Sequence, residues 1–394
     1  MGSCVAKSKR IKPAEISDSN ASRNNKLRLT MEFSQKQVEQ LTDANDSKIP
    51  TKRKVRKRKY TLQNVEQGDH GTLLLIRQRS MFLGQYSTEI QKGFEERGMK
   101  IEGEIQTTCL QSAGIWVNCR KGMKPDLPNQ DDYCILIDGP SYLLSVYDGH
   151  GQYGHDISNF VHSRLPNLMI AHPDWAENPK QAIKDTFVSC QQQLIDVCDK
   201  PETEFNCILS GTTATIVFYQ KNKLIVANVG DSRAVLAKLE NGKIIAHPIT
   251  RDHKPEEADE KHRIERAGGE VKKLKNDWAE RVYFKGKDSP GLSMTRALGD
   301  TMLQSIGISS EPETYEIDVE EEDQFVLICS DGVWEFISNQ EAVEYVYKFK
   351  GDVRQATEML SALAWSRWIK KDSSTVDDIT VILAYLPKNF ENNY

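Results

Sequence analysis

The clearest pattern in the chain is a series of short apolar runs that begins near Ser112. Each run is rich in Val, Ile, Leu, Tyr or Phe and is bounded by Gly, Asp, Asn or Pro. Runs of this length and composition predict buried β-strands. The predicted strands cover residues 112–119, 133–138, 142–148, 212–220, 223–231, 233–240, 323–331 and 378–386.

Helical periodicity, with apolar residues three or four positions apart, interrupts the strand series. It predicts helices over 154–169 and 179–199, the second with Pro179 at its first position, and a later pair over 339–349 and 352–368. The strands come in consecutive groups separated by helical pairs. This order favours an α+β fold of two antiparallel sheets flanked by helices over a doubly wound parallel sheet.

The pattern is weaker before residue 110. Residues 1–60 are polar and are predicted to be mostly disordered, apart from a short helix over 30–41. Residues 61–109 form an N-terminal extension in which a strand over 72–76 and a helix over 87–97 are predicted. The expected organisation is therefore an arm, 1–60, the extension, 61–109, a catalytic domain, 110–388, and a tail, 389–394.

Composition narrows the class of protein. A hydrophobic content of 38% with 28% charged residues is ordinary for a soluble globular protein. No apolar run approaches the roughly 18 residues that cross a bilayer, and no secretory apolar region follows the first residues, so we expect a location on the cytosolic side. The eight cysteines are scattered without a Cys-x-x-Cys pair. This spacing argues against a thiolate zinc site or a disulfide framework and for reduced, mostly buried thiols.

The net charge of −5 conceals an asymmetry between the arm and the rest of the chain. Residues 1–60 carry a net charge of +10 and residues 61–394 a net charge of −15. Seven of the eight residues in 52–59 are basic. This run reads as a nuclear localisation signal, a patch that binds anionic lipid, or a solvated charge run. A nucleic-acid role is poorly supported, because only Tyr60 supplies a nearby aromatic ring.

The first residues resemble a lipid-modification signal. Gly2 follows the initiator Met, Cys4 lies close by, and basic residues follow from Lys7 onwards. A myristoyl chain on Gly2 with a palmitoyl chain on Cys4 gives stable peripheral membrane binding, whereas one chain alone binds weakly. Ala6 departs from the pattern, which prefers Ser or Thr at that position. We expect membrane association, with nuclear import through 52–59 as the alternative.

Carboxylates recur where the predicted strands meet loops. The acids at these positions are Asp131, Asp132, Asp148, Asp331, Asp377 and Asp378. A single Asp-Gly pair is commonly only a turn, but a group of buried carboxylates requires a cation or a dense hydrogen-bond network. If these strand ends converge, they form an all-oxygen site that suits Mg²⁺ or Mn²⁺ and does not suit zinc.

His150 lies inside this set, between two glycines in Asp148-Gly149-His150-Gly151. The glycines let the backbone approach a ligand closely, so that a carbonyl oxygen as well as a carboxylate can coordinate a cation. A histidine in such a loop is either a structural residue or, beside a leaving alkoxide, a general acid with a pKa near neutrality.

The order of motifs resembles the type 2C metal-dependent protein serine/threonine phosphatases, and within them the subgroup whose first motif reads Asn-Gln-Asp. The resemblance covers about 110 to 388. The motifs are NQDD (129–132), VYDGHGQYGH (146–155), SGTTATI (210–216), VANVGDSRAV (226–235), TRDHKP (250–255), RIERAGGEV (263–271), DSPGLSMTRALGD (288–300), ICSDGVWEFIS (328–338) and DDITVIL (377–383).

The resemblance implies a four-layer α-β-β-α sandwich, with two divalent ions and a weaker third one at one end. The implied metal-binding positions are Asp131, Asp148, Gly149, Asp252, Asp331 and Asp377. Asp148 matches the acid that bridges both ions, and the Gly149 carbonyl binds the second. Asp252 matches an acid that holds the third ion together with Asp331. Water activated between the ions would attack the phosphoSer or phosphoThr of a protein substrate, and His150 would protonate the leaving oxygen.

Three positions depart from the family pattern. Gln130 stands where many relatives have a second acid, and Asp378 follows Asp377 where Asn is frequent. The insertion 123–128 separates the first motif from the basic residues that would bind substrate phosphate. Lys121 is the expected phosphate-binding base, with Arg120 as the alternative.

The remaining assignments concern the flap and rival functions. Residues 272–290 correspond to the family's variable flap and either recognise residues around the phosphate or form a solvated loop. Arg233 and Arg296 are expected to be salt-bridge partners, and Trp334 to be a core residue. The chain is expected to act as a monomer that binds no nucleic acid. A catalytically weak pseudophosphatase that acts as a binding or scaffold module is the alternative function.

Overall fold

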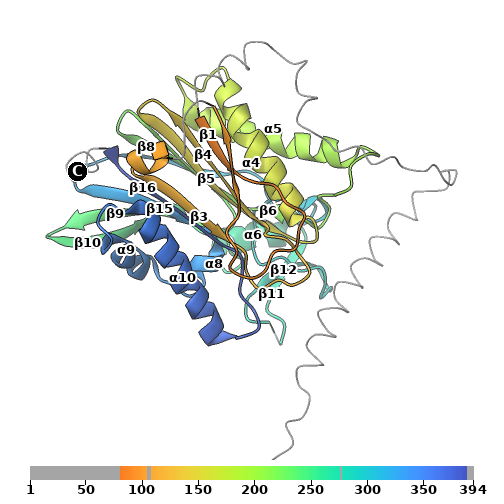
Figure 1. The fold of residues 1–394 in the computed structure, drawn as a ribbon. Helices are drawn as coiled ribbons and strands as arrows, with labels where there is room; N and C mark the ends of the chain where they lie inside the picture. Colours follow the sequence, from red (N-terminus) through yellow and green to blue (C-terminus); the bar gives the residue numbers. More distant parts are fainter. Residues whose placement is uncertain (1–79, 104–107, 276, 388–394) are drawn as a thin grey trace, which may run out of the picture. The chain divides into compact units, whose positions relative to one another are not determined.

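The computed structural model describes residues 80–387 except 104–107 and 276. All of these residues belong to one compact unit, which spans 62–394. The helix expected over 30–41, the strand over 72–76, the basic run 52–59 and the tail 389–394 lie outside the described residues. The described residues form two large antiparallel sheets with helices on their outer faces (Figure 1).

The larger sheet has nine strands, seven of which follow the order β14-β8-β7-β5-β4-β1-β2. Two short strands extend it beside β5. The bounds are β1 (Ser80–Gly84), β2 (Met99–Glu102), β4 (Asp131–Asp138), β5 (Ser141–His150), β6 (Gly211–Thr212), β7 (Ala214–Gln220), β8 (Lys223–Val229), β13 (Leu298–Gly299) and β14 (Glu313–Asp318).

The smaller sheet has five strands in the order β10-β9-β15-β16-β3. Its strands are β3 (Ile115–Arg120), β9 (Arg233–Glu240), β10 (Lys243–Pro248), β15 (Asp323–Cys329) and β16 (Ile379–Tyr385). A separate hairpin pairs β11 (Gly269–Lys272) with β12 (Arg281–Phe284).

Two pairs of helices cover the outer faces and complete four layers. Helices α4 (Gly154–Ala171) and α5 (Pro179–Cys198) cover the larger sheet, and α9 (Asn339–Tyr347) and α10 (Val353–Lys371) cover the smaller one. The predicted α+β sandwich and its main strands and helices are confirmed. The shorter helices are α3 (Thr108–Ser112), α6 (Ala258–Arg266), α7 (Thr301–Gln304) and α8 (Asp331–Trp334).

Local sequence fixes where the long helices begin. The Asn178 side chain accepts a hydrogen bond from Gln181 N, and Pro179 occupies the first turn of α5, where its missing N–H is not needed. Ser338 caps α9 in the same way by accepting from Glu341 N. Asp352 caps α10 by accepting from Gln355 N.

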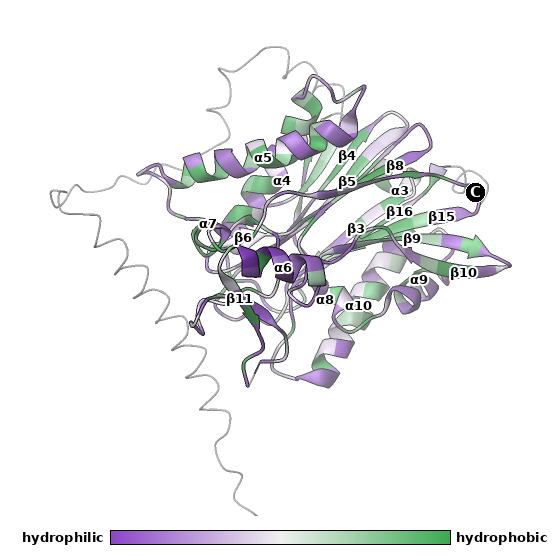
Figure 2. Cartoon of the chain, turned by 180° about the vertical axis from the view of Figure 1, so that it is seen from behind, coloured by the Kyte–Doolittle hydropathy of each residue, from purple (hydrophilic) through white to green (hydrophobic). Residues whose placement is uncertain are grey.

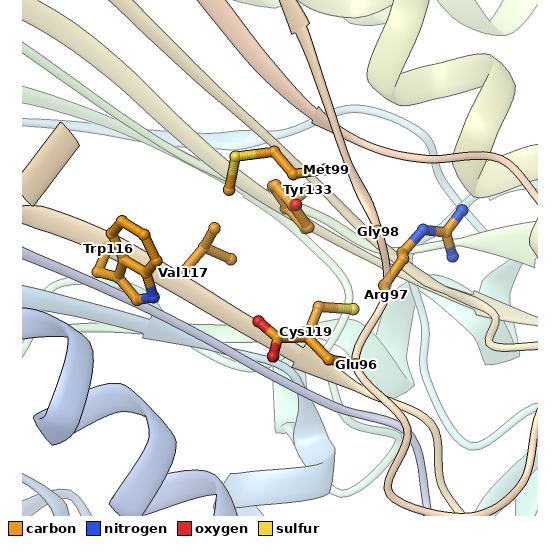
Figure 3. A pocket seen from close by; sticks show the side chains of 8 residues that line it. All are labelled: Glu96, Arg97, Gly98, Met99, Trp116, Val117, Cys119 and Tyr133. Carbon is orange, nitrogen blue, oxygen red and sulfur yellow. The ribbon is translucent and has the colours of Figure 1, made fainter. Parts of the chain in front are cut away.

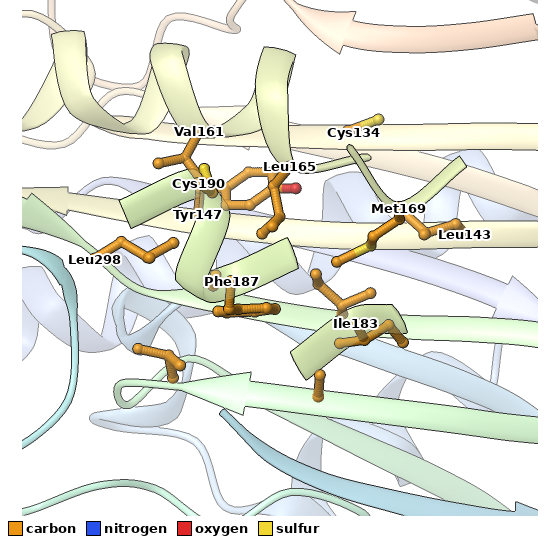
Figure 4. Close-up of a cluster of buried hydrophobic side chains, with 14 of the residues drawn as sticks. Cys134, Leu143, Tyr147, Val161, Leu165, Met169, Ile183, Phe187, Cys190 and Leu298 are labelled. Atoms are coloured by element: carbon orange, nitrogen blue, oxygen red, sulfur yellow. The ribbon is translucent and has the colours of Figure 1, made fainter. Parts of the chain in front are cut away.

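Three apolar clusters lie between the layers. One joins the larger sheet to α4 and α5 and includes Tyr147 from the sheet, Leu165 from α4 and Phe187 from α5 (Figure 4). A second lies between the two sheets, and a third joins the smaller sheet to α9 and α10. Trp334 belongs to this third cluster together with Leu360 and Ala364, which confirms the predicted core role of Trp334.

The N-terminal extension differs from the prediction. Residues 87–97 are not helical, so the helix predicted there is wrong. This segment instead runs beside β3, where Phe94 N donates to Lys121 O (2.6 Å) and Arg97 N to Cys119 O (2.8 Å). Strand β1 pairs with β4 and β2 pairs with β1. Strands β1 and β2 are therefore part of the larger sheet, while the segment between them contacts the smaller sheet.

Two further predictions concern the membrane and the cysteines. Among the described helices, none combines the length and the apolar character that spanning a bilayer requires. Six of the cysteines are described as free thiols, and all of these except Cys198 are buried. Within the described residues, the prediction of reduced, mostly buried thiols is confirmed.

Candidate active site

Four strands bring the predicted acids to one end of the two sheets. Asp131 begins β4 and lies directly opposite Asp148 on β5 in the antiparallel register. In the smaller sheet Asp331 follows β15 and Asp377 precedes β16. Because β15 and β16 are antiparallel neighbours, the end of one strand lies beside the start of the other.

Asp131 connects the two sheets. Its Oδ2 accepts hydrogen bonds from Ser330 Oγ (2.7 Å) and Thr380 Oγ1 (2.7 Å), which both belong to the smaller sheet's side of the site. Its Oδ1 is buried and has no hydrogen-bond partner among the described residues. Burial and the nearby Asp378 raise the pKa of Asp131 to about 7. A buried carboxylate oxygen without a partner calls for a cation or an ordered water.

Asp148 is buried and Asp331 is partly buried, and both lie close to other acids. Burial, followed by the charges of Asp131 and Asp331, raises the pKa of Asp148 well above its usual range. Burial, followed by Asp377 and Asp231, does the same for Asp331, whose buried Oδ1 has no partner in the described part of the chain. Divalent cations relieve such repulsion, and oxygen donors are the ligands that Mg²⁺ and Mn²⁺ prefer. The residues present therefore fit a divalent-metal centre.

The backbone around Asp148 is tightly packed. A Cβ on Gly149 would lie 2.3 Å from Gly154 O and 2.6 Å from Gln130 O, so a larger residue would displace the strand end. The Gln130 side chain donates from Nε2 to Gly151 O (2.7 Å). Gln130 thus ties the Asp148–Gly151 loop to the first motif.

His150 is held by Asp300, at the start of α7. His150 Nε2 lies 2.6 Å from Asp300 Oδ2. Burial opposes the charged imidazolium, but the Asp300 carboxylate outweighs this effect and raises the pKa of His150. Gly211 makes room for the pair, because a Cβ there would lie 2.3 Å from Asp300 Oδ2 and 2.8 Å from His150 Nε2. The sequence reading did not identify Asp300 as this partner.

The two adjacent acids before β16 have different surroundings. Asp378 is fully buried and accepts hydrogen bonds from Gly122 N (2.6 Å) and Gln130 N (2.9 Å). Burial alone would raise the pKa of Asp378, but Lys124 and Lys121 hold it below its usual range. The Asp377 side chain is partly exposed and acts electrostatically on Asp148 and Asp331. Asp377 is therefore the one that faces the acid cluster.

The basic residues before the first motif are not placed as expected. Lys121 is completely buried, with Nζ 3.3 Å from Asp378 Oδ1. Arg120 donates to Asn118 Oδ1 (3.1 Å) and pairs with Glu96. Lys124, in the insertion 123–128, instead reaches the cluster: its ammonium contacts Asp377 and lies 3.7 Å from Asp378 Oδ2. Of these three basic residues, Lys124 is therefore the one whose ammonium contacts Asp377, the acid that faces the cluster.

A second lysine and a further acid lie near Asp331. Asp252, expected to hold a third ion, has both carboxylate oxygens engaged by Arg233, at 2.8 and 2.6 Å. Asp231 is buried and contacts Lys254 Nζ (2.5 Å), and its Oδ1 has no partner among the described residues. Asp231, not Asp252, therefore offers an open oxygen near Asp331. Asp231 was not identified, although it ends the predicted strand 223–231 and so carries the same signal as Asp148 and Asp331.

A separate acid cluster is neutralised by arginines. Asp259, Glu260 and Glu313 have oxygens within 4.8 Å of one another. The buried Glu260 accepts from Arg263 Nη2 (2.7 Å) and Arg296 Nη2 (2.6 Å). This network is structural, and together with the Arg233–Asp252 pair it confirms the predicted salt-bridge roles of Arg233 and Arg296.

The predicted flap 272–290 contains β12 and an exposed aromatic side chain. Trp278 is 61% exposed, and its carbonyl accepts from Lys273 Nζ (2.8 Å). An exposed indole can contact a peptide, but substrate recognition by the flap stays a prediction.

Comparison with known proteins agrees with this geometry. The family model described as protein phosphatase 2C matches residues 128–371. Probable protein phosphatase 2C 35 of Arabidopsis thaliana is 33% identical over 295 residues, which cover 68% of this chain and 82% of the relative. Probable protein phosphatase 2C 64 of Oryza sativa subsp. japonica is 36% identical over 249 residues, which cover 62% and 58%.

Solved structures share the fold. The serine-threonine phosphatase 2C from Toxoplasma gondii aligns with a TM-score of 0.60 at 21% identity, covering 69% of this chain and 94% of that one. A C. elegans sex determining protein aligns with a TM-score of 0.58 at 21% identity, covering 71% and 66%. The family match spans more than half of the sequence, and the acids of its motifs converge at one site. This chain therefore belongs to the protein phosphatase 2C family of metal-dependent serine/threonine phosphatases.

Proposed function

We propose that this protein hydrolyses phosphoSer and phosphoThr in protein substrates by direct attack of water activated between two divalent ions. The observation that carries the proposal is the convergence of buried and partly buried carboxylates from both sheets, with unpartnered oxygens on Asp131 and Asp331 among the described residues. Two bound cations would lower the pKa of a water held between them and stabilise the charge that develops on the phosphoryl group.

The carboxylates divide the work of holding the ions. Asp148, with the Gly149 carbonyl, would hold both ions, and Asp331 and Asp377 would bind the first. Ser330 and Thr380 fix the direction of the Asp131 carboxylate. With its direction fixed, Asp131 would support the metal centre. A weaker third ion would bind between Asp331 and Asp231, since Arg233 occupies the oxygens of Asp252. Either Mg²⁺ or Mn²⁺ suits these oxygen donors.

His150 donates a proton to the departing serine or threonine oxygen. Asp300, at 2.6 Å, orients the imidazole and stabilises its protonated form. Such a positioned acid contributes about 10²- to 10⁴-fold to a rate. Its contribution should fall with a leaving group that departs without a proton.

Lys124 binds the phosphate of the substrate. It is the basic residue of 120–124 whose charge lies at the acid cluster, whereas Lys121 and Arg120 are committed to other partners. As a compact ammonium it would act as a point charge and not as a two-pronged clamp.

The test is hydrolysis of a phosphothreonine peptide by the full-length protein in EDTA, Mg²⁺ or Mn²⁺. The proposal predicts turnover that requires a divalent ion and disappears in D148A. D138A is the matched control, because Asp138 ends the strand that Asp131 begins, about 23 Å away at the usual rise per residue. The pseudophosphatase alternative has no support from the comparisons. An absence of turnover in every metal, from folded protein, would contradict the proposal.

For localisation, we propose that acylation of Gly2 and Cys4, with the basic run 52–59, binds the protein to the cytosolic face of a membrane. The support is sequence alone. Labelling with an alkyne analogue of myristate in cells tests this: wild type and S3A should be labelled and membrane-bound, and G2A should be neither. Unlabelled wild-type protein that accumulates in the nucleus would favour import through 52–59.

A further inference from the structure

Arg97 is a buried cation in the N-terminal extension, outside the residues that the family model matches. Its side chain is 3% exposed. The guanidinium donates from Nη1 to Asn129 O (3.0 Å) and Asp131 O (2.6 Å). Nη2 donates to Asp132 Oδ2 (2.9 Å). The Arg97 side chain therefore binds the backbone carbonyls on either side of Gln130 and also binds the carboxylate of Asp132 in β4.

The charge of Arg97 is compensated within the core. Asp132 is fully buried and also lies 2.6 Å from His162 Nδ1 on α4. The neighbouring strand leaves room for this pair: a Cβ on Gly84 of β1 would lie 2.1 Å from Asp132 Oδ1 and 2.7 Å from Arg97 Nε. Close neighbours leave this buried ion pair little space to move, so it can hold the backbone that it contacts.

The chain around Arg97 is itself anchored. Its backbone N–H donates to Cys119 O on β3 (2.8 Å), so its position is set by the smaller sheet. In Figure 3 its guanidinium extends away from Trp116 and Val117, which line a pocket of about 370 Å³ together with the Arg97 stem. Arg97 thus links the smaller sheet to the first motif of the larger one.

Asp131 is consequently held at two points. Its carboxylate oxygen is fixed by Ser330 and Thr380, and its backbone carbonyl is fixed by Arg97. We propose that Arg97 is a positioning residue that fixes Asp131 for divalent-metal binding, which makes residues 80–102 part of the metal site. This inference rests on the proposed metal-dependent function.

The test compares Mn²⁺ binding, measured by calorimetry, in the full-length wild type, R97K and H162Q. Lysine keeps the charge beside Asp132 but cannot reach both carbonyls, so R97K should bind Mn²⁺ about 10-fold or more weakly, as expected when an outer-shell partner is lost. H162Q is the matched control: it disturbs the same buried acid, but among the described residues His162 makes no hydrogen bond or ion pair with 129–131. It should lower the melting temperature while leaving Mn²⁺ affinity within about twofold of wild type, well below the change expected for R97K.

A kinetic readout separates positioning from general damage. Raising Mn²⁺ should restore the kcat of R97K, and its KM for a phosphothreonine peptide should stay unchanged. If R97K does not fold, R97Q/D132N removes both charges together and should show the same loss of Mn²⁺ affinity. If R97K or R97Q/D132N folds and binds Mn²⁺ with wild-type affinity, the inference about Arg97 is wrong, but the proposed function is not affected. Wild-type protein that binds no Mn²⁺ would overturn the proposed function as well.

Discussion

Replacing Lys124 with alanine should strengthen the binding of Mn²⁺ and lower kcat/KM for a phosphothreonine peptide. Lys124 contacts Asp377 and lies 3.7 Å from Asp378 Oδ2. Burial opposes its charge, but Asp377, Asp378 and Asp148 outweigh burial and raise the pKa of Lys124 well above its usual range. The side chain is therefore an ammonium ion, and under the proposed function it competes with metal for the carboxylates and attracts the phosphate of a substrate.

The size of each effect follows from these contacts. At 3.7 Å and an effective dielectric constant of about 20, two unit charges interact by roughly 4.5 kcal/mol. Solvent at a side chain that is 28% exposed reduces this value, so we expect K124A to bind Mn²⁺ about 10-fold more tightly, which corresponds to about 1.4 kcal/mol. A hydrogen bond to a charged group contributes about 1.5–3 kcal/mol, so kcat/KM should fall roughly 10- to 150-fold, mainly through KM.

The assay is Mn²⁺ titration by calorimetry with steady-state kinetics on a phosphothreonine peptide at saturating Mn²⁺. K124M should behave like K124A, because it keeps the length of the side chain and removes the charge. K100A is the control, since Lys100 is a surface residue paired with Glu102. Weaker Mn²⁺ binding in K124A, or an unchanged KM, would refute this reasoning.

Three further predictions address the proton donor, the arginine network and the core. H150A should lower kcat on a phosphothreonine peptide by about 10²- to 10⁴-fold, with a smaller loss on an aryl phosphate; equal losses would argue against proton donation. Burial would raise the pKa of Glu260, but hydrogen bonds from Arg263 and Arg296 hold it below its usual range. Its stabilisation is therefore present above about pH 4.3 and lost as the pH falls below that value. E260Q should cost about 3–5 kcal/mol at pH 7 and progressively less on acidification, as measured by urea unfolding; a pH-independent difference would contradict this. F187A, at a fully buried site, should cost about 3–5 kcal/mol; a change below about 1 kcal/mol in the same assay would contradict its core role.

Strands and helices that bury an apolar face were predictable from the sequence. The runs 133–138, 323–331 and 378–386 are apolar because they lie between layers, and the spacing in 154–169 and 179–199 matches helices that cover a sheet. Helix α6 was not predicted because it buries little apolar surface; it is almost entirely hydrophilic in Figure 2. The helix over 87–97 was wrongly predicted because long-range hydrogen bonds to β3 decide its conformation, which local spacing cannot indicate.

Some residues of the active site were likewise predictable from the sequence, and others were not. The positions of acids at strand ends predicted that Asp131 and Asp148 converge. In the structure, the antiparallel register of β4 and β5 places these two residues opposite each other. Which basic residue enters the cluster depends on how the insertion 123–128 folds, so Lys124 was not predicted. Asp252 carries the right charge, but only the structure shows that Arg233 engages both of its oxygens. Arg97 was not identified because a single arginine in a polar segment gives no sign of burial.

The most direct test of the account is the number of Mn²⁺ ions that the wild-type protein binds, measured by calorimetry beside D148A and D138A. The account predicts at least two ions per chain for wild type and D138A, and loss of this binding in D148A, because Asp148 is the ligand that both ions share. Wild-type stoichiometry in D148A, or no binding by the wild-type protein, would contradict it.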